Sequence, residues 1–163
     1  MKQIILMRHG KSSWEYDVSD KDRPLKERGI RDAHLVARKF IDSGVKIDAA
    51  FSSPANRALH TSMIFLRILN YDLDDFGVKE NLYDFSGNSV SDFVKSLDSG
   101  LETIVIFGHN YAFTNLANRW GDQYIENLPT AGLVQIQFNE QDWSNIQKGS
   151  TKQIIFPKQL RTT

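Results

Sequence analysis

Histidine adjoins glycine at two distant places in the chain, once with an arginine before it, and a further arginine lies between the two places. These are Arg8-His9-Gly10, Gly108-His109-Asn110, and Arg57, which follows Ser52-Ser53-Pro54. Guanidinium groups bind phosphate oxygens through forked hydrogen bonds, and a neutral imidazole can attack phosphorus as a nucleophile. A second, protonated imidazole would donate to the equatorial oxygens, where negative charge accumulates in the transition state. These residue types therefore predict a site for phosphoryl transfer.

Other kinds of site have little support in the sequence. There is no Walker-type glycine-rich loop and no cluster with metal-ligand spacing, and the absence of cysteine excludes thiolate metal sites, disulfides and cysteine nucleophiles. We therefore expect neither a metal nor a cofactor. Gly10 and Gly108 would let the backbone approach a ligand closely. The remaining histidines, His34 and His60, are expected to be structural or surface residues.

Short apolar runs precede each of the three candidate segments, and helical patterns lie between the runs. Strands are predicted at 3–7, 48–51 and 103–107, with a weak strand at 78–80, an alternating strand at 131–138 and a partner for it at 152–156. Helices are predicted at 27–43, ended by Gly44, at 55–69, begun by Pro54, and at 89–98 and 113–120. The alternation at 131–138 indicates a half-exposed strand near a sheet edge, with Gln135 and Gln137 on its polar face.

Buried strands that alternate with helices are typical of an α/β fold. We expect a three-layer sandwich, with a mainly parallel central sheet and helices on both faces. In such sheets the carboxyl ends of the strands share one edge, where ligands bind. Arg8, His9, Arg57 and His109 should therefore meet at one rim.

Composition describes an ordinary globular chain of 163 residues, 40% hydrophobic and 25% charged, which predicts a single domain over residues 1–163. The 20 basic and 20 acidic residues cancel, which argues against a nucleic-acid partner. Arg8 ends the first apolar run too early for a secretory signal, and no run is long enough to span a membrane. We expect a cytoplasmic protein with no membrane partner. The tryptophans, expected to be packing residues, are Trp14, Trp120 and Trp143.

The ordered set of motifs resembles the histidine phosphatase superfamily, which has the phosphoglycerate mutase-like fold, and most closely its SixA-like branch of phosphohistidine phosphatases. The resemblance extends over residues 3–160. The motifs are Met7-Arg8-His9-Gly10-Lys11-Ser12-Ser13-Trp14, Asp22-Arg23-Pro24-Leu25 with Arg28-Gly29, Ser52-Ser53-Pro54-Ala55 with Arg57, Ala58 and Thr61, Gly108-His109-Asn110, Leu128-Pro129-Thr130, and Trp143 with Pro157-Lys158.

The resemblance implies a role for each candidate residue. His9 corresponds to a nucleophile that is transiently phosphorylated, and Arg8, Arg57 and His109 correspond to the phosphate pocket around it. The implied activity is a metal-independent phosphatase with a phosphohistidine intermediate, acting on phosphohistidine in a protein. Two alternatives stay open: a phosphatase of small phosphomonoesters, and a non-catalytic module that recognises phosphate.

Two positions depart from the family pattern. Tyr111 replaces a proline that often follows Gly-His-Asn, which could alter the loop but should leave His109 in place. Larger members carry a glutamate proton donor in an insertion, for which the short stretch between Arg57 and His109 leaves little room. Glu80 is the best positional candidate for this donor and Asp84 the next, although Glu80 could equally be a solvated strand end.

An open pocket would admit a protein side chain, and phosphohistidine needs little help from an acid.

Overall fold

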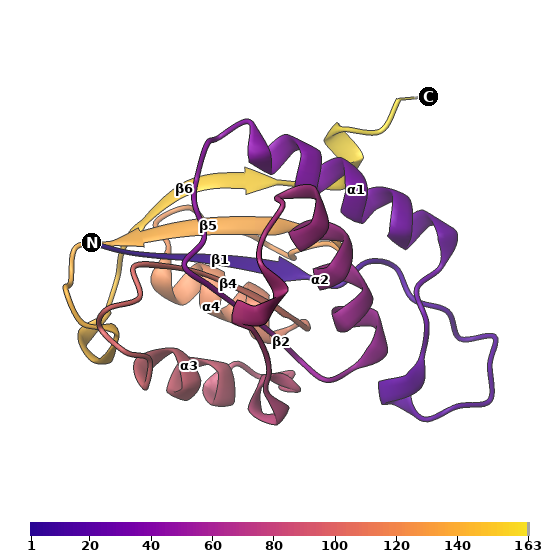
Figure 1. Cartoon of the computed structure of the whole chain (residues 1–163), viewed down its shortest axis with the longest axis horizontal. Coiled ribbons are helices and arrows are strands. Elements are labelled where there is room, and N and C mark those ends of the chain that lie inside the picture. The colour runs from indigo at the N-terminus through magenta and orange to yellow at the C-terminus, as the bar shows by residue number, and fades with distance from the viewer. Residues whose placement is uncertain (163) are drawn as a thin grey trace.

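The computed structural model describes residues 1–162, in which one six-stranded sheet runs through the molecule (Figure 1). The strands are β1 (Lys2–Arg8), β2 (Ala49–Ser52), β3 (Phe76–Val78), β4 (Thr103–Gly108), β5 (Leu133–Phe138) and β6 (Ser150–Ile155). Their order is β3-β2-β4-β1-β5-β6, in which the first four are parallel and β5 and β6 are antiparallel to their neighbours. The mainly parallel sheet is thus confirmed.

Helices cover both faces of the sheet. Their bounds are α1 (Glu27–Ile41), α2 (Asn56–Ile68), α3 (Asn88–Lys95) and α4 (Ala112–Trp120). In β1, Ile5 and Met7 belong to the core with α1 and α2, whereas Ile4 and Leu6 belong to the core with α3 and α4. Figure 1 shows these two pairs of helices on opposite sides of the strands. The predicted three-layer α/β sandwich is therefore confirmed, because each buried strand presents apolar side chains to both faces.

The structure shifts some element boundaries. The weak strand predicted at 78–80 is β3 and ends at Val78, so that Glu80 lies in a following 3-10 turn, Glu80–Leu82. Helix α1 ends two residues before the predicted bound, and Gly44 then adopts a φ of 71°. This left-handed conformation favours glycine and closes the helical segment, as the sequence indicates.

The prediction of a half-exposed strand at 131–138 is wrong for one of its two polar positions. Gln135 is buried in β5. Its burial is tolerated because its side-chain amide donates to Gln3 and its carbonyl accepts from Gln153. Gln3 and Gln153 lie on the two neighbouring strands, β1 and β6. The three glutamine side chains are therefore hydrogen-bonded in a row across this face of the sheet. A period-two pattern shows which residues share a face, but it does not show that polar groups on that face can satisfy one another.

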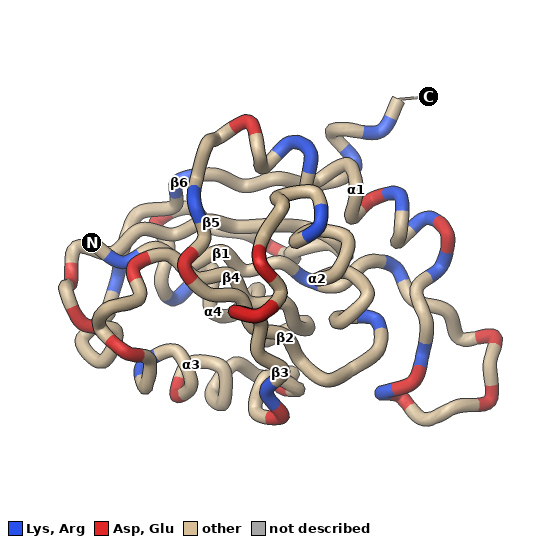
Figure 2. The backbone as a smooth tube through the Cα atoms, in the orientation of Figure 1, with Lys and Arg blue, Asp and Glu red and all other residues tan. Residues whose placement is uncertain are grey.

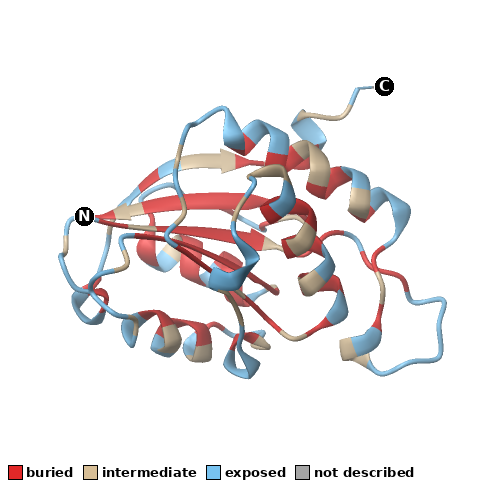
Figure 3. Cartoon of the chain, viewed as in Figure 1, coloured by how far each residue is buried: buried red, intermediate tan, exposed pale blue. Residues whose placement is uncertain are grey.

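The three tryptophans have different surroundings. Trp120 and Trp143 are buried, as predicted. Trp14 is 76% exposed, and the prediction that it is a packing residue is wrong. It lies in the long loop between β1 and α1, whose residues 14–19 are all exposed and stand out from the body of the molecule (Figure 3). Within residues 1–162, no helix has the length and apolar character needed to span a membrane.

Candidate active site

The candidate residues come from three adjacent strands, β2, β4 and β1, with β4 in the middle. The backbone N–H of His9 donates to Gly108 O over 3.1 Å, and Ser53 N donates to Phe107 O over 3.0 Å. The three segments that follow the strands are therefore connected directly by backbone hydrogen bonds. The predicted meeting of these segments at one rim is confirmed, with 5.3 Å between the ring centroids of His9 and His109.

Glycines fix the loop that carries His9. A Cβ on Gly10 would lie 2.6 Å from the carbonyl oxygen of Gly29, and one on Gly29 would lie 2.3 Å from that of Lys11. The backbone of α1 therefore packs directly on this loop. Gly10 N also donates to Thr61 Oγ1 of α2 over 3.0 Å.

The expectation that Gly10 and Gly108 make room for a ligand is replaced by a packing role. A Cβ on Gly108 would lie 2.7 Å from Phe113 Cζ, so this glycine accommodates a ring of α4. Both glycines let neighbouring parts of the fold approach, and this approach in turn holds the two histidine segments in place.

His9 is 7% exposed, and its two ring nitrogens have different partners. Nδ1 lies 2.7 Å from Gly10 O, and Nε2 lies 3.3 Å from Arg57 Nε. Because a carbonyl accepts and a guanidinium only donates, these partners assign the proton to Nδ1 and the lone pair to Nε2. Burial, together with the positive charge of Arg57 and Arg8 and the His109 ring, lowers the pKa of His9 well below its usual range. His9 is therefore neutral, with Nε2 as its basic nitrogen.

His109 is also neutral in this structure. Burial first, and then the positive charge of Arg57, lower its pKa to about 3. Its Nε2 lies 2.8 Å from Ser53 Oγ. The protonated second imidazole expected from the sequence is thus wrong for the site as it stands, because two guanidinium groups and burial already disfavour another positive charge. A hydrogen-bond donor is still available here: if Ser53 donates to Nε2, the neutral ring carries its proton on Nδ1.

Two buried nitrogens lack a hydrogen-bond partner within residues 1–162, and both belong to predicted site residues. They are Arg8 Nε and His109 Nδ1. The Arg8 side chain is otherwise held by a hydrogen bond from Nη1 to Leu128 O over 2.8 Å. Buried polar atoms without a partner are rare, and each calls for an explanation such as a bound group.

Arg57 is held by an acidic residue that the sequence analysis missed. Its Nη2 donates to Asp20 Oδ2 over 2.9 Å, and its Nη1 donates to Asp20 O over 2.6 Å. Burial alone would raise the pKa of Asp20, but hydrogen bonds from Tyr83 and Arg57 hold it well below its usual range. Asp20 is therefore ionised and fixes the guanidinium beside His9. The only sequence signal for it is its position just before the Asp22–Leu25 motif.

Arg8, His9, Asp20 and Arg57 line a cavity of about 300 Å³, at the lower end of the range for small-molecule sites. His109 is not among the lining residues, although its ring lies 5.3 Å from that of His9. The lining contains the basic residues at the strand ends and two exposed aromatic residues, Trp14 and Phe85. The lining residues are Arg8, His9, Lys11, Ser12, Trp14, Asp20, Arg23, Arg57, Phe85, Asn110 and Thr130. Neither aromatic residue was predicted to belong to the site, because Trp14 was expected to be a packing residue and Phe85 lies in a segment without periodicity.

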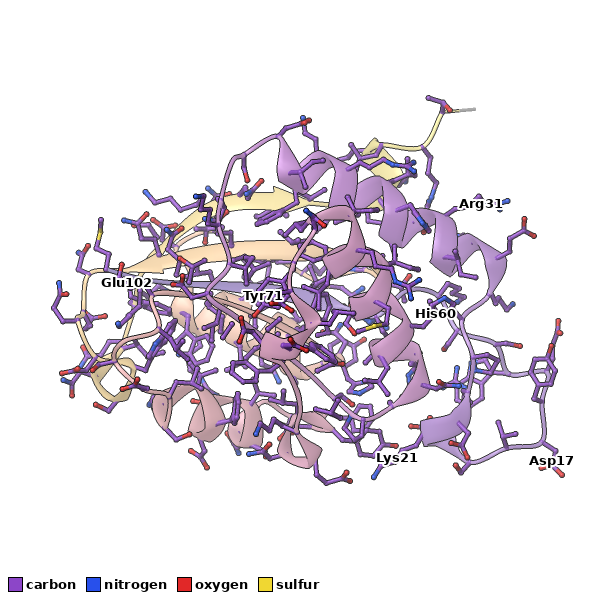
Figure 4. The ribbon with its side chains drawn as sticks, in the orientation of Figure 1. Asp17, Lys21, Arg31, His60, Tyr71 and Glu102 are labelled. Carbon is purple, nitrogen blue, oxygen red and sulfur yellow. The ribbon has the colours of Figure 1, made fainter. Side chains whose placement is uncertain are left out.

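Neither proton-donor candidate lines this cavity. Glu80 is exposed, and its carboxylate pairs with Lys21, which Figure 4 labels beside the protruding loop. Asp84 lies four residues before α3, and its Oδ2 accepts from the backbone N–H groups of Gly87 and Val90, each over 3.0 Å. The structure brings Arg8, His9, Arg57 and His109 together, whereas Glu80 and Asp84 are not among the residues that line the cavity beside His9.

Neither His34 nor His60 lines this cavity. His34 Nδ1 lies 2.8 Å from Ile30 O in α1, and His60 is exposed on α2 (Figure 4). A larger cavity of about 590 Å³ adjoins α1, where Figure 2 shows several basic positions. It lies away from the strand ends, and the buried Asp32 in its lining is paired with Arg161 over 2.6 Å.

Comparison with protein families identifies the chain. The model of the histidine phosphatase superfamily (branch 1) matches residues 4–88, which is just over half of the sequence. The chain belongs to the histidine phosphatase superfamily. The matched range contains the segments that carry Arg8, His9 and Arg57. Membership supports an enzyme of the phosphatase or mutase type.

Curated relatives agree with this family. An uncharacterised protein of Mycobacterium tuberculosis (strain CDC 1551 / Oshkosh) is 25% identical over 161 residues, covering 92% of this chain and 98% of the relative. A 2,3-bisphosphoglycerate-dependent phosphoglycerate mutase of Staphylococcus haemolyticus is 38% identical over 69 residues, which cover 40% of this chain and 30% of the mutase. The match to the mutase thus spans less than a third of that enzyme.

Solved structures of this superfamily fold match nearly the whole chain. The protein histidine phosphatase SixA, in complex with tungstate, superposes with a TM-score of 0.82 at 22% identity and covers 98% of this chain and 99% of its own. A mycobacterial glucosyl-3-phosphoglycerate phosphatase superposes with a TM-score of 0.65 at 13% identity, covering 93% and 97%. The predicted phosphoglycerate mutase-like fold is confirmed, and the likeness to SixA is a likeness of fold.

Proposed function

We propose that the protein is a metal-independent phosphatase that uses His9 as a nucleophile and acts on phosphohistidine in another protein. One observation carries the proposal: neutral His9 presents the lone pair of Nε2 beside Arg57, while Nδ1 is held by Gly10 O. The hydrogen bond at Nδ1 sets both the tautomer and the ring orientation. A nitrogen prepared in this way is a nucleophile, and simple phosphate recognition would need only the arginines.

In the first step, His9 Nε2 attacks phosphorus in line with the leaving group. The new N–P bond forms as the bond from phosphorus to the leaving group breaks, and His9 becomes phosphorylated. Arg8 and Arg57 stabilise the equatorial oxygens. Arg8 Nε and His109 Nδ1, which have no partner within residues 1–162, supply two further donors to them, the second of them when Ser53 donates to His109 Nε2. The Gly10 carbonyl stabilises the positive charge that His9 gains.

In the second step, water attacks the phosphorylated His9. The N–P bond breaks, inorganic phosphate leaves, and His9 returns to its neutral form. Cationic side chains supply the charge stabilisation that a metal ion provides in other phosphatases. Activity is therefore expected to survive exhaustive chelation, measured as turnover before and after treatment with a chelator. A strict requirement for an added divalent ion would contradict this part of the proposal.

Phosphohistidine suits this site because its leaving group makes little demand on an acid. An imidazole that is already protonated leaves as a stable neutral molecule, whereas an alkoxide must be protonated as it departs. Among the residues described, Glu80 and Asp84 both lie outside the cavity lining. A role for Glu80 as proton donor stays a prediction that would require its pairing with Lys21 to break.

A small phosphate ester is the alternative substrate. It is favoured by the partial match to phosphoglycerate mutases and by the shared fold with a glucosyl-3-phosphoglycerate phosphatase.

For partners, we propose a phosphorylated protein and neither nucleic acid nor a membrane, and we propose that the enzyme acts in the cytoplasm.

Turnover of a phosphohistidine-containing protein, compared with a panel of alkyl phosphates, tests the proposal. We expect the first to be hydrolysed with a much higher kcat/KM, and His9→Ala to abolish turnover in a folded protein. Preference for the alkyl phosphates would favour the alternative substrate. Full activity of His9→Ala would overturn the histidine nucleophile, and absence of any turnover in the wild type would favour a recognition module.

A further inference from the structure

Trp14 is fixed in place although most of its surface is exposed. The guanidinium carbon of Arg23 lies 3.2 Å from the centroid of the Trp14 ring, so one face of the indole rests on a cation. Arg23 itself is only 7% exposed. A large apolar side chain in an exposed loop would ordinarily sample several rotamers, and this stacking restrains it.

Three hydrogen bonds fix Arg23 beneath the indole. Its Nε donates to Ser13 O over 3.0 Å, its Nη2 to Ser12 Oγ over 2.6 Å, and its Nη1 to Asp20 Oδ1 over 3.2 Å. Asp20 also holds Arg57, so the support of the indole and the cation beside His9 share one carboxylate. The position of Trp14 is thereby coupled to the candidate active site.

The other face of Trp14 is open, and Trp14 lines the same cavity as His9. Basic and polar side chains predominate in that cavity, whereas Trp14 and Phe85 add exposed aromatic surface to it. A phosphoryl group would pair with the basic residues. The aromatic surface would then be free to contact the leaving group of the substrate. Exposed aromatic side chains next to a binding site are typical of recognition surfaces.

We infer that Trp14 is a specificity-determining residue that stacks on a planar ring in the leaving group of the substrate. The inference rests on the proposed function, because it takes the phosphoryl group to lie beside His9. The imidazole of phosphohistidine is such a ring, and so is the aryl group of an aryl phosphate. Aliphatic leaving groups lack the flat surface that stacking requires.

Two non-hydrolysable anions separate this role from phosphate binding. Phenylphosphonate and methylphosphonate share the charged group and differ in the ring, so the ratio of their dissociation constants measures what the ring contributes. The ratio is measured by titration calorimetry for the wild type, Trp14→Ala and Trp14→Phe. Tyr16→Ala is the matched control, because Tyr16 is exposed in the same loop and does not line the cavity.

We expect the wild type and Tyr16→Ala to bind phenylphosphonate about two- to tenfold more tightly than methylphosphonate. Trp14→Ala should bring the ratio close to one and leave the affinity for methylphosphonate unchanged, while Trp14→Phe retains part of the preference.

Three results would overturn the inference: a wild-type ratio of one, a ratio that survives in Trp14→Ala, or an equal loss of both anions in Trp14→Ala. The last would show that Trp14 only supports the loop. Failure of the wild type to bind either anion would refute the phosphate site itself, and with it both the proposed function and this inference.

Discussion

At the scale of single residues, Asp20 positions the cation that lies beside the nucleophile. Its carboxylate accepts from Arg57, Arg23 and Tyr83, and its backbone oxygen accepts a further hydrogen bond from Arg57. An arginine side chain has many rotamers, and fixing one of them before the substrate binds lowers the cost of ordering it in the transition state. Asp20 is thus a positioning residue, which acts through Arg57.

Asp20→Asn is expected to lower kcat/KM about tenfold, because the charge that holds Arg57 is lost while the shape is kept. The loss should fall mainly on kcat, since Arg57 would still reach the bound phosphoryl group but in a less fixed geometry. Steady-state kinetics measure both constants. Asp22→Asn is the control, because the Asp22 side chain accepts from Ser19 and does not line the cavity. Equal effects of the two variants would argue against a positioning role for Asp20.

At the scale of elements, the sequence predicts the strands and helices well, and it predicts their ends and loops less well. Apolar periodicity reports burial, so the fully buried β4 and the amphipathic α1 are found within one or two residues of their ends. The segment from Lys11 to Asp20 has no periodicity, and its conformation depends on side-chain contacts that no local pattern shows, such as those of Ser12 and Ser13 with Arg23. The exposure of Trp14 and the pairing of Asp20 with Arg57 are of this kind.

Gly29 offers a test of how the elements hold the site. A Cβ there would meet backbone atoms of the His9 loop at 2.3 and 2.7 Å, and backbone cannot move aside as a flexible side chain can. Gly29→Ala is expected to destabilise the fold by about 1–3 kcal/mol and to lower kcat, because α1 and the loop must separate. Thermal unfolding and turnover measure the two effects.

Gly100→Ala is the matched control. Its Cβ would approach only the Asp98 side chain, at 3.1 Å, and it should keep wild-type activity. A Gly29→Ala variant that is equally stable and active would show that the close packing of α1 on the loop is dispensable.

At the scale of the whole molecule, the buried histidines make stability depend on pH. The pKa of His109 is about 3 in the folded chain, against 6.5 for an unperturbed histidine. Between these pH values the unfolded chain binds a proton that the folded chain does not, so the free energy of unfolding falls as the pH is lowered. His9, whose pKa is also lowered, acts in the same direction.

Denaturant unfolding of the wild type and of His109→Gln, from pH 7 down to pH 4, measures this dependence. Each such histidine contributes a slope of up to about 1.4 kcal/mol per pH unit. The variant should therefore lose stability less steeply than the wild type over this range. Parallel curves for the two proteins would mean that His109 titrates normally in the folded chain.

The fold and the four central side chains of the site could be predicted from the sequence. The contacts around these side chains could not. The carboxyl ends of parallel strands lie at one edge of the sheet, whatever conformation the following loops adopt. Arg8, His9, Arg57 and His109 could therefore be grouped from the apolar runs alone. The protonation of His109 could not be predicted in the same way. It depends on burial and on how near the two arginines lie, and only the folded geometry gives these.

If His9 is the nucleophile, it carries the phosphoryl group during turnover. Rapid quenching under alkaline conditions, which preserve phosphohistidine, followed by peptide mass spectrometry, tests this directly with a phosphohistidine-containing protein as substrate. We expect a phosphoryl group on the peptide that contains residue 9, formed at a rate consistent with kcat and absent from His9→Ala. Turnover without this species in the wild type, or a phosphoryl group on another residue, would contradict this role of His9.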